Sequence, residues 1–467
     1  MSKPESVSPQ RPTIWFEVED FIRYFDRVPN PSGIQRVQME IFSAVRALQG
    51  QRSAIGFCRL DWFSQRFEPV EFETLTRIFE HPPLAASVPP PASSRSGMVG
   101  WIRRQPQELR VAVRQLLRRL RGQLRRLAHR HSAVSGVPFR RGDVLLCTGA
   151  AWDNARYGEM IARLRRERGV AFSAILYDLI PLTHPQWVGR GYVEVFRRWL
   201  LGVVANADLV LAISGYSRSA LIEWAGREKA ALPRSKVLPL GTGFRELSSH
   251  PAGVDLGTLL PPAYALYVST LEPRKNHRLL LRVWRRLLEK HGEGRIPPLV
   301  LAGRRGWMID DLLAELERTA YLGGKIILLP DLADAQLREA YRRSIFSVFP
   351  SFVEGWGLPV AESLEQGKLC IASNRASIPE VGGELVDYID PEDEEGALAA
   401  VERAIFDDEY RRGREARIRA EYRPASWAEC VEALLASLDE IRESRAEAMR
   451  DPSPIARESV PVGGASP

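Results

Sequence analysis

Short apolar segments alternate with longer amphipathic segments along most of this chain. An apolar run bounded by Gly, Pro or Asp predicts a strand, and apolar residues at helical spacing predict a helix. In the first half, strands are predicted at 13–19, 143–149, 171–178, 208–214 and 236–241, with helices at 34–48, 157–168, 192–206 and from Tyr216. In the second half, strands are predicted at 264–270, 298–303, 325–330, 345–350 and 369–373, each followed by a helix. This alternation predicts two parallel sheets covered by helices.

The length of the chain indicates more than one domain. Its 467 residues are too many for one ordinary core and suit two domains of about 200 residues. A loop containing Gly and Pro at 244–262 separates the two series of strands. We therefore expect the following organisation: a disordered N-terminus at 1–11, an N-terminal domain at 12–250 with an insertion at 81–135, a C-terminal domain at 262–425, a last helix at 426–449 and a disordered tail at 450–467.

Composition excludes several classes of protein. Hydrophobic residues make up 45% and charged residues 26%, as in ordinary soluble domains. The four cysteines are scattered without C-x-x-C spacing, which argues against a zinc site or a disulfide scaffold and fits a reducing cytoplasm. No apolar run approaches the roughly 18 residues of a membrane span, and the first residues lack the apolar core of a signal peptide. We expect a cytoplasmic protein.

The most informative segment runs from Ser347 to Glu380. An apolar run ends there in a loop with the sequence EGWGLP, and a helix begins at about Leu358. Glu354 precedes this helix and Glu362 lies on its second turn. A helix N-terminus preceded by glycines can hold a phosphate, and the two carboxylates can accept hydrogen bonds from hydroxyl groups. The segment thus suits a ligand with sugar, diphosphate and nucleoside parts.

This segment resembles the C-terminal signature of the retaining glycosyltransferases of family 4, which use nucleotide-sugar donors. In their pattern, two glutamates are separated by seven residues that include the sequence Gly-Phe-Gly-Leu-Pro. In this chain Trp356 takes the place of the Phe. The sequence SNRASIPEVGG that ends at Gly383 is also similar. The resemblance implies the GT-B fold, in which two Rossmann-like doubly wound parallel-sheet domains face a cleft and a C-terminal helix crosses back. It also implies that Glu354 binds hydroxyls of the donor sugar and that Glu362 binds the ribose, although Glu362 could be an ordinary helical glutamate.

The resemblance assigns further residues to the donor. In STLEPRKNHRLLL, Arg274 and Lys275 follow a predicted strand, and the family places both on the diphosphate, where fixed cations stabilise the departing charge. A solvated basic pair is the alternative. Gly355, Gly357 and Leu358 would offer backbone N–H groups to phosphate or sugar. Glu380 recurs in the family without an obvious ligand, so we expect a structural role.

Two loops of the N-terminal half are also similar to the family. In NPSGIQRV, Gly33 would let the backbone approach donor phosphate or acceptor, although Ser32 stands where the family has a second glycine; a plain helix start is the alternative. In YDLIPLTHPQW, Asp178 and His184 resemble residues that face the transferred sugar, and a helix-capping histidine is the alternative. Ser214 and Ser217 are expected to cap a helix.

The expected mechanism needs neither a cofactor nor a metal. Family members are held to use front-face attack, in which the leaving phosphate deprotonates the acceptor hydroxyl, so the enzyme contributes positioning and electrostatics. No Asp-x-Asp motif in a suitable loop suggests a metal site. The nucleotide-sugar, a UDP-, GDP- or dTDP-hexose, would be a substrate.

Basic charge is concentrated in one segment. Residues 103–131 contain ten arginines and one acid, Glu108, so their net charge of +9 exceeds the +7 of the whole chain. Seven apolar residues fall on one face of a helix through 103–130: Leu109, Val113, Leu116, Leu117, Leu120, Leu124 and Leu127. Such a helix could lie on an anionic membrane surface, or pack its leucines on the N-terminal domain. Nucleic acid is disfavoured because no stacking aromatics accompany the arginines.

These observations predict a hexosyltransferase that moves mannose, rhamnose or glucose to a glycan. We expect this glycan to be linked to a polyprenyl lipid. The expected pathway is surface polysaccharide biosynthesis, such as that of O-antigen. Two alternatives are a GT-B sugar synthase with a small soluble acceptor and a catalytically inactive glycan-binding scaffold. We expect the protein in the cytoplasm or on the inner face of the plasma membrane.

Overall fold

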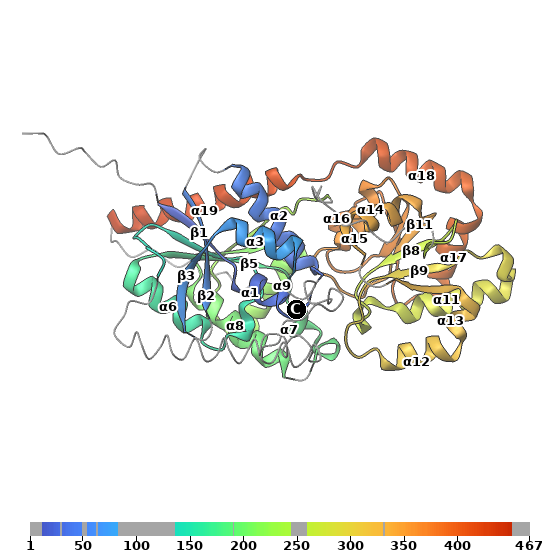
Figure 1. The fold of residues 1–467 in the computed structure, drawn as a ribbon, viewed down its shortest axis with the longest axis horizontal. Coiled ribbons are helices and arrows are strands. Elements are labelled where there is room, and N and C mark those ends of the chain that lie inside the picture. The colour runs from blue at the N-terminus through green and yellow to red at the C-terminus, as the bar shows by residue number, and fades with distance from the viewer. Residues whose placement is uncertain are drawn as a thin grey trace, which may run out of the picture.

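The computed structural model describes residues 12–28, 30–48, 54–61, 64–82, 136–189, 191–243, 259–329 and 332–450. Within these ranges the chain forms two α/β domains that lie side by side, each built on its own sheet (Figure 1). The predicted fold class of two Rossmann-like domains is thus confirmed. The Arg-rich segment 103–130 and most of the predicted insertion at 81–135 lie outside the described residues.

The N-terminal sheet has seven strands in the order β3-β2-β1-β4-β5-β6-β7. Their bounds are β1 Thr13–Glu17, β2 Ala54–Asp61, β3 Arg66–Val70, β4 Val144–Cys147, β5 Ala171–Leu176, β6 Leu209–Ala212 and β7 Arg234–Val237. The three strands β4 to β6 are buried on both faces, which explains their continuous apolar sequences. The strand order changes direction between β1 and β4, and ligands of such sheets bind at this point.

The helices of the N-terminal domain cover both faces of this sheet. They are α1 Glu19–Phe25, α2 Gly33–Ala47, α3 Phe72–Glu80, α6 Tyr157–Arg168, α7 Ile180–Thr183, α8 Tyr192–Asn206 and α9 Gly215–Glu228. Two short 3₁₀ turns, η2 Ala151–Asp153 and η3 Pro185–Trp187, follow β4 and α7.

The C-terminal sheet has six parallel strands in the order β10-β9-β8-β11-β12-β13. Their bounds are β8 Ala265–Val268, β9 Leu299–Ala302, β10 Ile326–Leu329, β11 Phe346–Phe349, β12 Cys370–Ser373 and β13 Asp387–Ile389. The helices are α11 His277–His291, α12 Asp310–Arg318, α13 Ala320–Gly324, α14 Asp334–Arg343, α15 Leu358–Glu365, α16 Ile378–Gly382, α17 Glu394–Phe406 and α18 Asp408–Glu421. Here the strand order changes direction between β8 and β11.

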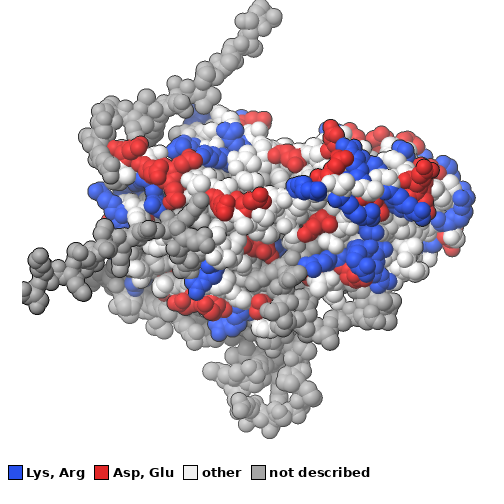
Figure 2. Space-filling model, turned by 90° about the horizontal axis from the view of Figure 1, so that it is seen from above, with Lys and Arg blue, Asp and Glu red and all other residues white. Residues whose placement is uncertain are grey.

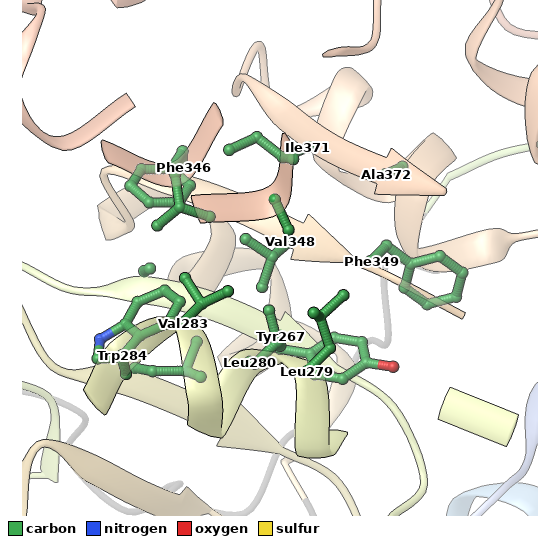
Figure 3. Packing of buried hydrophobic residues seen from close by; sticks show 14 of the residues in the cluster. Tyr267, Leu279, Leu280, Val283, Trp284, Phe346, Val348, Phe349, Ile371 and Ala372 are labelled. Atoms are coloured by element: carbon green, nitrogen blue, oxygen red, sulfur yellow. The ribbon is translucent and has the colours of Figure 1, made fainter. Parts of the chain in front are cut away.

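Helix α11 illustrates how the C-terminal core is filled. Its side chains Leu280, Val283 and Trp284 point toward the strands, where Phe346 and Val348 of β11 lie opposite (Figure 3). All five side chains are at most 2% exposed. The spacing of the helix residues places them on one face, so the amphipathic pattern of the sequence corresponds directly to the packing.

The last helix, α19 Trp427–Arg450, leaves the C-terminal domain and runs along the N-terminal one (Figure 1). Its buried side chains Cys430, Leu434 and Leu438 join the same hydrophobic cluster as β1 and α2. At its start, Ser426 and Glu429 exchange hydrogen bonds with each other's backbone N–H. The crossing helix of the predicted fold class is therefore present.

Several elements differ from the sequence-based expectation. The hairpin β2–β3, helix α1 and strand β13 had not been predicted, and β3 pairs antiparallel to β2, so the N-terminal sheet is not wholly parallel. The antiparallel strand lies at the edge of the sheet, where a hairpin needs no crossover helix. The other strands are shorter than predicted, and β7 begins at Arg234, two residues before its predicted start.

The surface of the described residues is not dominated by one sign of charge. On the face shown in Figure 2, basic and acidic side chains are intermixed on the C-terminal domain. On α18, for example, Arg417 pairs with Glu421 and Arg419 with Glu415. None of the described helices combines the length and the apolar character needed to cross a membrane.

Candidate functional site

A cleft of about 830 Å³ lies between the two domains. It is lined by residues that follow the carboxyl ends of the strands in both sheets, where ligands of doubly wound sheets bind. The lining includes nine of the residues predicted for the site: Gly33, Asp178, Arg274, Lys275, Glu354, Gly355, Gly357, Leu358 and Glu362. His184, the tenth, is not part of this lining.

Glu354 is held between two cations. Strands β8 and β11 are neighbours, so the loops that follow them meet. Arg274 Nη1 lies 2.6 Å from Glu354 Oε2, and Lys275 Nζ lies 2.5 Å from Glu354 Oε1. The three residues that the resemblance assigned to the sugar and the diphosphate therefore form one ion-paired cluster.

The environment shifts the pKa of both Glu354 and Lys275. Burial alone would raise the pKa of the Glu354 carboxyl, but Arg274 and Lys275 outweigh burial and lower the pKa to about 2. Burial and the neighbouring Arg274 lower the pKa of the Lys275 ammonium, while Glu354 opposes the shift. The Lys275 ammonium also lies 5.2 Å from the centre of the Phe349 ring, within cation–π range.

Two further carboxyl groups border the cations. Glu272 pairs with Arg274 at 2.6 Å between Oε1 and Nε, and only 2% of the Glu272 residue surface is exposed. Burial raises the pKa of the Glu272 and Asp178 carboxyls, and the nearby cations oppose this shift. Asp178 Oδ1 also accepts a hydrogen bond from the N–H of Ile180. Carboxylates thus face the cations from both domains.

The glycine loop before α15 fits tightly against the N-terminal domain. A Cβ on Gly355 would lie 2.3 Å from the carbonyl oxygen of Tyr177, so only glycine allows this close approach. Gly357 has φ +130°, a backbone conformation that also favours glycine. Ser377 Oγ donates to the carbonyl oxygens of Glu354 and Trp356, which fixes the loop from behind.

Glu362 makes an ion pair across the cleft. Its Oε1 lies 2.7 Å from Nη1 of Arg36 on α2, and its Oε2 accepts a hydrogen bond from the Tyr341 hydroxyl. Arg36 also lies 3.5 Å from Asp334. Beside this pair, a Cβ on Gly33 would contact Leu358 at an ordinary distance of 3.5 Å. The NPSGIQRV loop of one domain is therefore docked on helix α15 of the other.

His184 lies in an aromatic stack at the edge of the cleft. Its ring stacks on Trp187 at 4.9 Å, and Trp187 stacks on Phe352 of the other domain at 5.3 Å. His184 Nδ1 shares a hydrogen bond with the Thr183 hydroxyl, and burial lowers the pKa of the imidazole. The catalytic role suggested for His184 stays a prediction, as do the roles of the other site residues.

Glu380 connects the two domains. Its carboxylate accepts hydrogen bonds from the backbone N–H of Gly215, at 2.6 Å, and of Tyr216, at 2.8 Å, at the start of α9. Ser214 Oγ accepts from the N–H of Ser217 and so caps the same helix, as predicted. Ser217 was also expected to cap it, but its Oγ donates to the carbonyl oxygen of Tyr177, at 3.1 Å. We expected a structural role for Glu380, and its contact in the structure joins the two domains.

Sequence analysis missed several residues of the cleft. Arg36 lies in NPSGIQRV and Glu272 in STLEPRKNHRLLL. Their charge, close to Gly33 and to the Arg274–Lys275 pair, was the available signal. Trp307 and Trp152 also line the cleft but belong to no recognised pattern. Among the described residues, no three His, Cys, Asp or Glu side chains gather in a way that could hold a metal ion.

Comparison with known proteins agrees with this geometry. Residues 256–420 match the family model described as glycosyl transferases group 1. The chain is 32% identical over 271 residues to the O-antigen chain mannosyltransferase B of Escherichia coli, covering 57% of this chain and 69% of that protein. It is 26% identical over 286 residues to the serotype-specific mannosyltransferase WbdA of Escherichia coli, but spans only 34% of that longer protein.

A solved structure extends the similarity over nearly the whole chain. Sucrose-phosphate synthase from Thermosynechococcus elongatus aligns with a TM-score of 0.55 and 16% identity, covering 94% of this chain and 98% of that one. At this identity the match establishes the GT-B fold alone. Together with the sequence relatives, it leads to one conclusion: the chain belongs to the group 1 glycosyltransferases.

Proposed function

We propose that this chain transfers a hexose, with mannose favoured, from a nucleotide-sugar to a glycan in surface polysaccharide biosynthesis. The observation that carries the proposal is the Glu354 carboxylate held by Arg274 and Lys275 inside the cleft. The preference for mannose rests on the relatives described as O-antigen and serotype-specific mannosyltransferases.

The charges of the site suit transfer from a diphosphate. Arg274 and Lys275 supply fixed positive charge where the leaving diphosphate would develop negative charge, and they are already ordered by Glu354, Glu272 and the Phe349 ring. Such ordering reduces the reorganisation that the reaction requires. This supports departure of the diphosphate without a metal ion and without a protein cofactor.

Retention of configuration is part of the proposal. Glu354 is engaged by two cations, and its pKa of about 2 makes it a poor base, so it suits the orientation of sugar hydroxyls. The leaving phosphate would then take the proton of the acceptor hydroxyl on the same face of the sugar. Glu362 would accept hydrogen bonds from the ribose hydroxyls once donor binding weakens its ion pair with Arg36.

The proposal is tested by nucleoside-diphosphate release from UDP-, GDP- and dTDP-hexoses, each with and without EDTA. Release from one donor, most directly GDP-mannose, with a product of unchanged anomeric configuration by NMR, is expected. Loss of release with EDTA would refute metal independence, and a product of inverted configuration would refute retention. No release from any donor, with glycan and polyprenyl-linked acceptors supplied, would favour the glycan-binding scaffold.

We also propose that the acceptor is linked to a membrane lipid and that the segment 103–130 binds an anionic membrane surface. The support is the arginine and leucine pattern of the sequence. Co-sedimentation with vesicles containing phosphatidylglycerol is expected at low salt and should weaken as salt rises. Equal recovery with neutral vesicles, or none with either, would refute the membrane role.

A further inference from the structure

A second cavity of about 460 Å³ lies beside the cleft, lined by residues of α7 and α8 of the N-terminal domain. The two cavities share the side chains of Asp178, Tyr192 and Arg274 as walls. A group bound in this second cavity would therefore lie next to the ion-paired cluster around Glu354. We call it the aromatic cavity, because of the side chains that line it.

Four aromatic rings of the N-terminal domain form one side of the aromatic cavity. Trp152 lies at their centre, with ring-centroid distances of 6.1 Å to Tyr192, 5.4 Å to Phe196 and 5.6 Å to Trp199. Trp152 belongs to the turn after β4, whereas the other three rings lie on α8. Because these rings pack on one another, they form a rigid apolar wall before any ligand binds.

The C-terminal domain completes the aromatic cavity. Trp307, which follows β9, donates a hydrogen bond from Nε1 to the carbonyl oxygen of Trp187, at 2.7 Å. Both tryptophans line the aromatic cavity, and Trp187 also stacks on Phe352. The outer wall of the aromatic cavity thus depends on the same domain contact that assembles the donor site.

The few polar groups of the aromatic cavity restrict what it can bind. Asp178 and Arg274 lie on the side that faces the cleft. Trp199 is only 4% exposed, and its Nε1 has no hydrogen-bond partner in the described part of the chain. An alkyl chain in the aromatic cavity would leave the Trp199 N–H without a partner, which is costly in a buried site.

A pyranose ring meets these requirements. Its C–H faces are apolar enough to stack on aromatic rings, and its oxygens can accept from an indole N–H and donate to a carboxylate. We propose that the aromatic cavity binds the terminal pyranose of the acceptor glycan and presents one of its hydroxyls beside Asp178 to the donor. This inference rests on the proposed transferase function and specifies the acceptor class as a saccharide recognised by aromatic stacking.

The first test is binding without a donor. Several tryptophans line the aromatic cavity, so their fluorescence reports its occupancy. The probes are methyl glycosides and disaccharides of mannose, glucose and rhamnose, with decyl phosphate as a lipid-like competitor. Saturable quenching by at least one saccharide is expected. Quenching by decyl phosphate alone, or by none of the probes, would overturn the proposal.

The second test uses Trp199→Phe, which keeps the ring and removes the N–H. Loss of one hydrogen bond predicts an acceptor KM that is about three- to tenfold higher, with a smaller change in donor KM. Trp224→Phe is the matched control, because Trp224 lies in the same domain, is also 4% exposed and lines neither cavity. Equal acceptor KM values in the two variants would refute the role of the aromatic cavity.

These outcomes separate the two proposals. If wild-type protein releases no nucleoside diphosphate from any donor, the proposed function fails, whatever the fluorescence titration gives. The other case is that wild-type protein releases nucleoside diphosphate while saccharides fail to quench the fluorescence and Trp199→Phe leaves the acceptor KM unchanged. In that case only the acceptor proposal fails.

Discussion

At the residue scale, the account depends on a buried lysine that is paired with a buried carboxylate. Lys275 is 7% exposed and touches Glu354. Burial and the charge of Arg274 lower its pKa, so the ammonium loses its proton at a lower pH than an exposed lysine does. Lys275, which we propose faces the diphosphate, is thus the first positive charge of the cluster to be lost as pH rises.

This pKa shift predicts an alkaline limb in the pH dependence of kcat/KM. Activity should fall as pH rises through the lowered pKa of Lys275, because the neutral amine no longer stabilises the leaving group. In Lys275→Arg the limb should move to higher pH, since a guanidinium does not deprotonate in this range, although overall activity falls with the altered geometry. The same limb in both proteins would show that another group titrates.

At the element scale, helix α16 contacts the start of α9 behind the Glu354 loop. Helix α16 supports the Glu354 loop through Ser377 and reaches the first residues of α9 through Glu380. A carboxylate at a helix N-terminus is favourable because the free N–H groups carry partial positive charge. Through Ser377 and Glu380, the Glu354 loop is therefore connected to the start of α9 in the other domain.

Removing the carboxylate should weaken this connection. Glu380→Ala is expected to lower kcat/KM about two- to fivefold, since a charge at a helix N-terminus contributes about 0.3–1 kcal/mol. Glu380→Gln should restore part of the loss, because it keeps an acceptor oxygen. Steady-state kinetics with the preferred donor measures both. Glu384→Ala is the control, since Glu384 pairs with Arg417 on α18 and not with the other domain. An equal loss in the control would exclude a specific role for the Glu380 contact.

At the scale of the whole molecule, local pattern predicted the strand and helix order well. Segments such as 157–168 and 192–206 have strong helical periodicity, and the structure has α6 and α8 with the same bounds. The hairpin β2–β3 was missed because its residues mix charged and apolar side chains without clean alternation. The crossing helix followed from the family resemblance, since no local pattern indicates which domain α19 covers.

The candidate site divides in the same way. Glu354, Arg274 and Lys275 lie in motifs that local sequence and resemblance identified. Partners such as Glu272 and Arg36, and the aromatic cavity around Trp152, depend on how the two domains meet. Such contacts join residues far apart in the chain, and periodicity carries no information about them. His184 was identified from its loop, but its stacking on Trp187 could not be foreseen.

The most direct test of the central claim compares nucleoside-diphosphate release by wild type with that by Glu354→Ala and Lys275→Ala. Each variant should lose at least about a hundredfold in kcat, because each removes a fixed charge of the donor site. Glu402→Ala breaks a surface ion pair with Lys290, outside both cavities, and should retain wild-type release. Release by Glu354→Ala and Lys275→Ala at the rate of Glu402→Ala would contradict the assignment of this cluster to the donor.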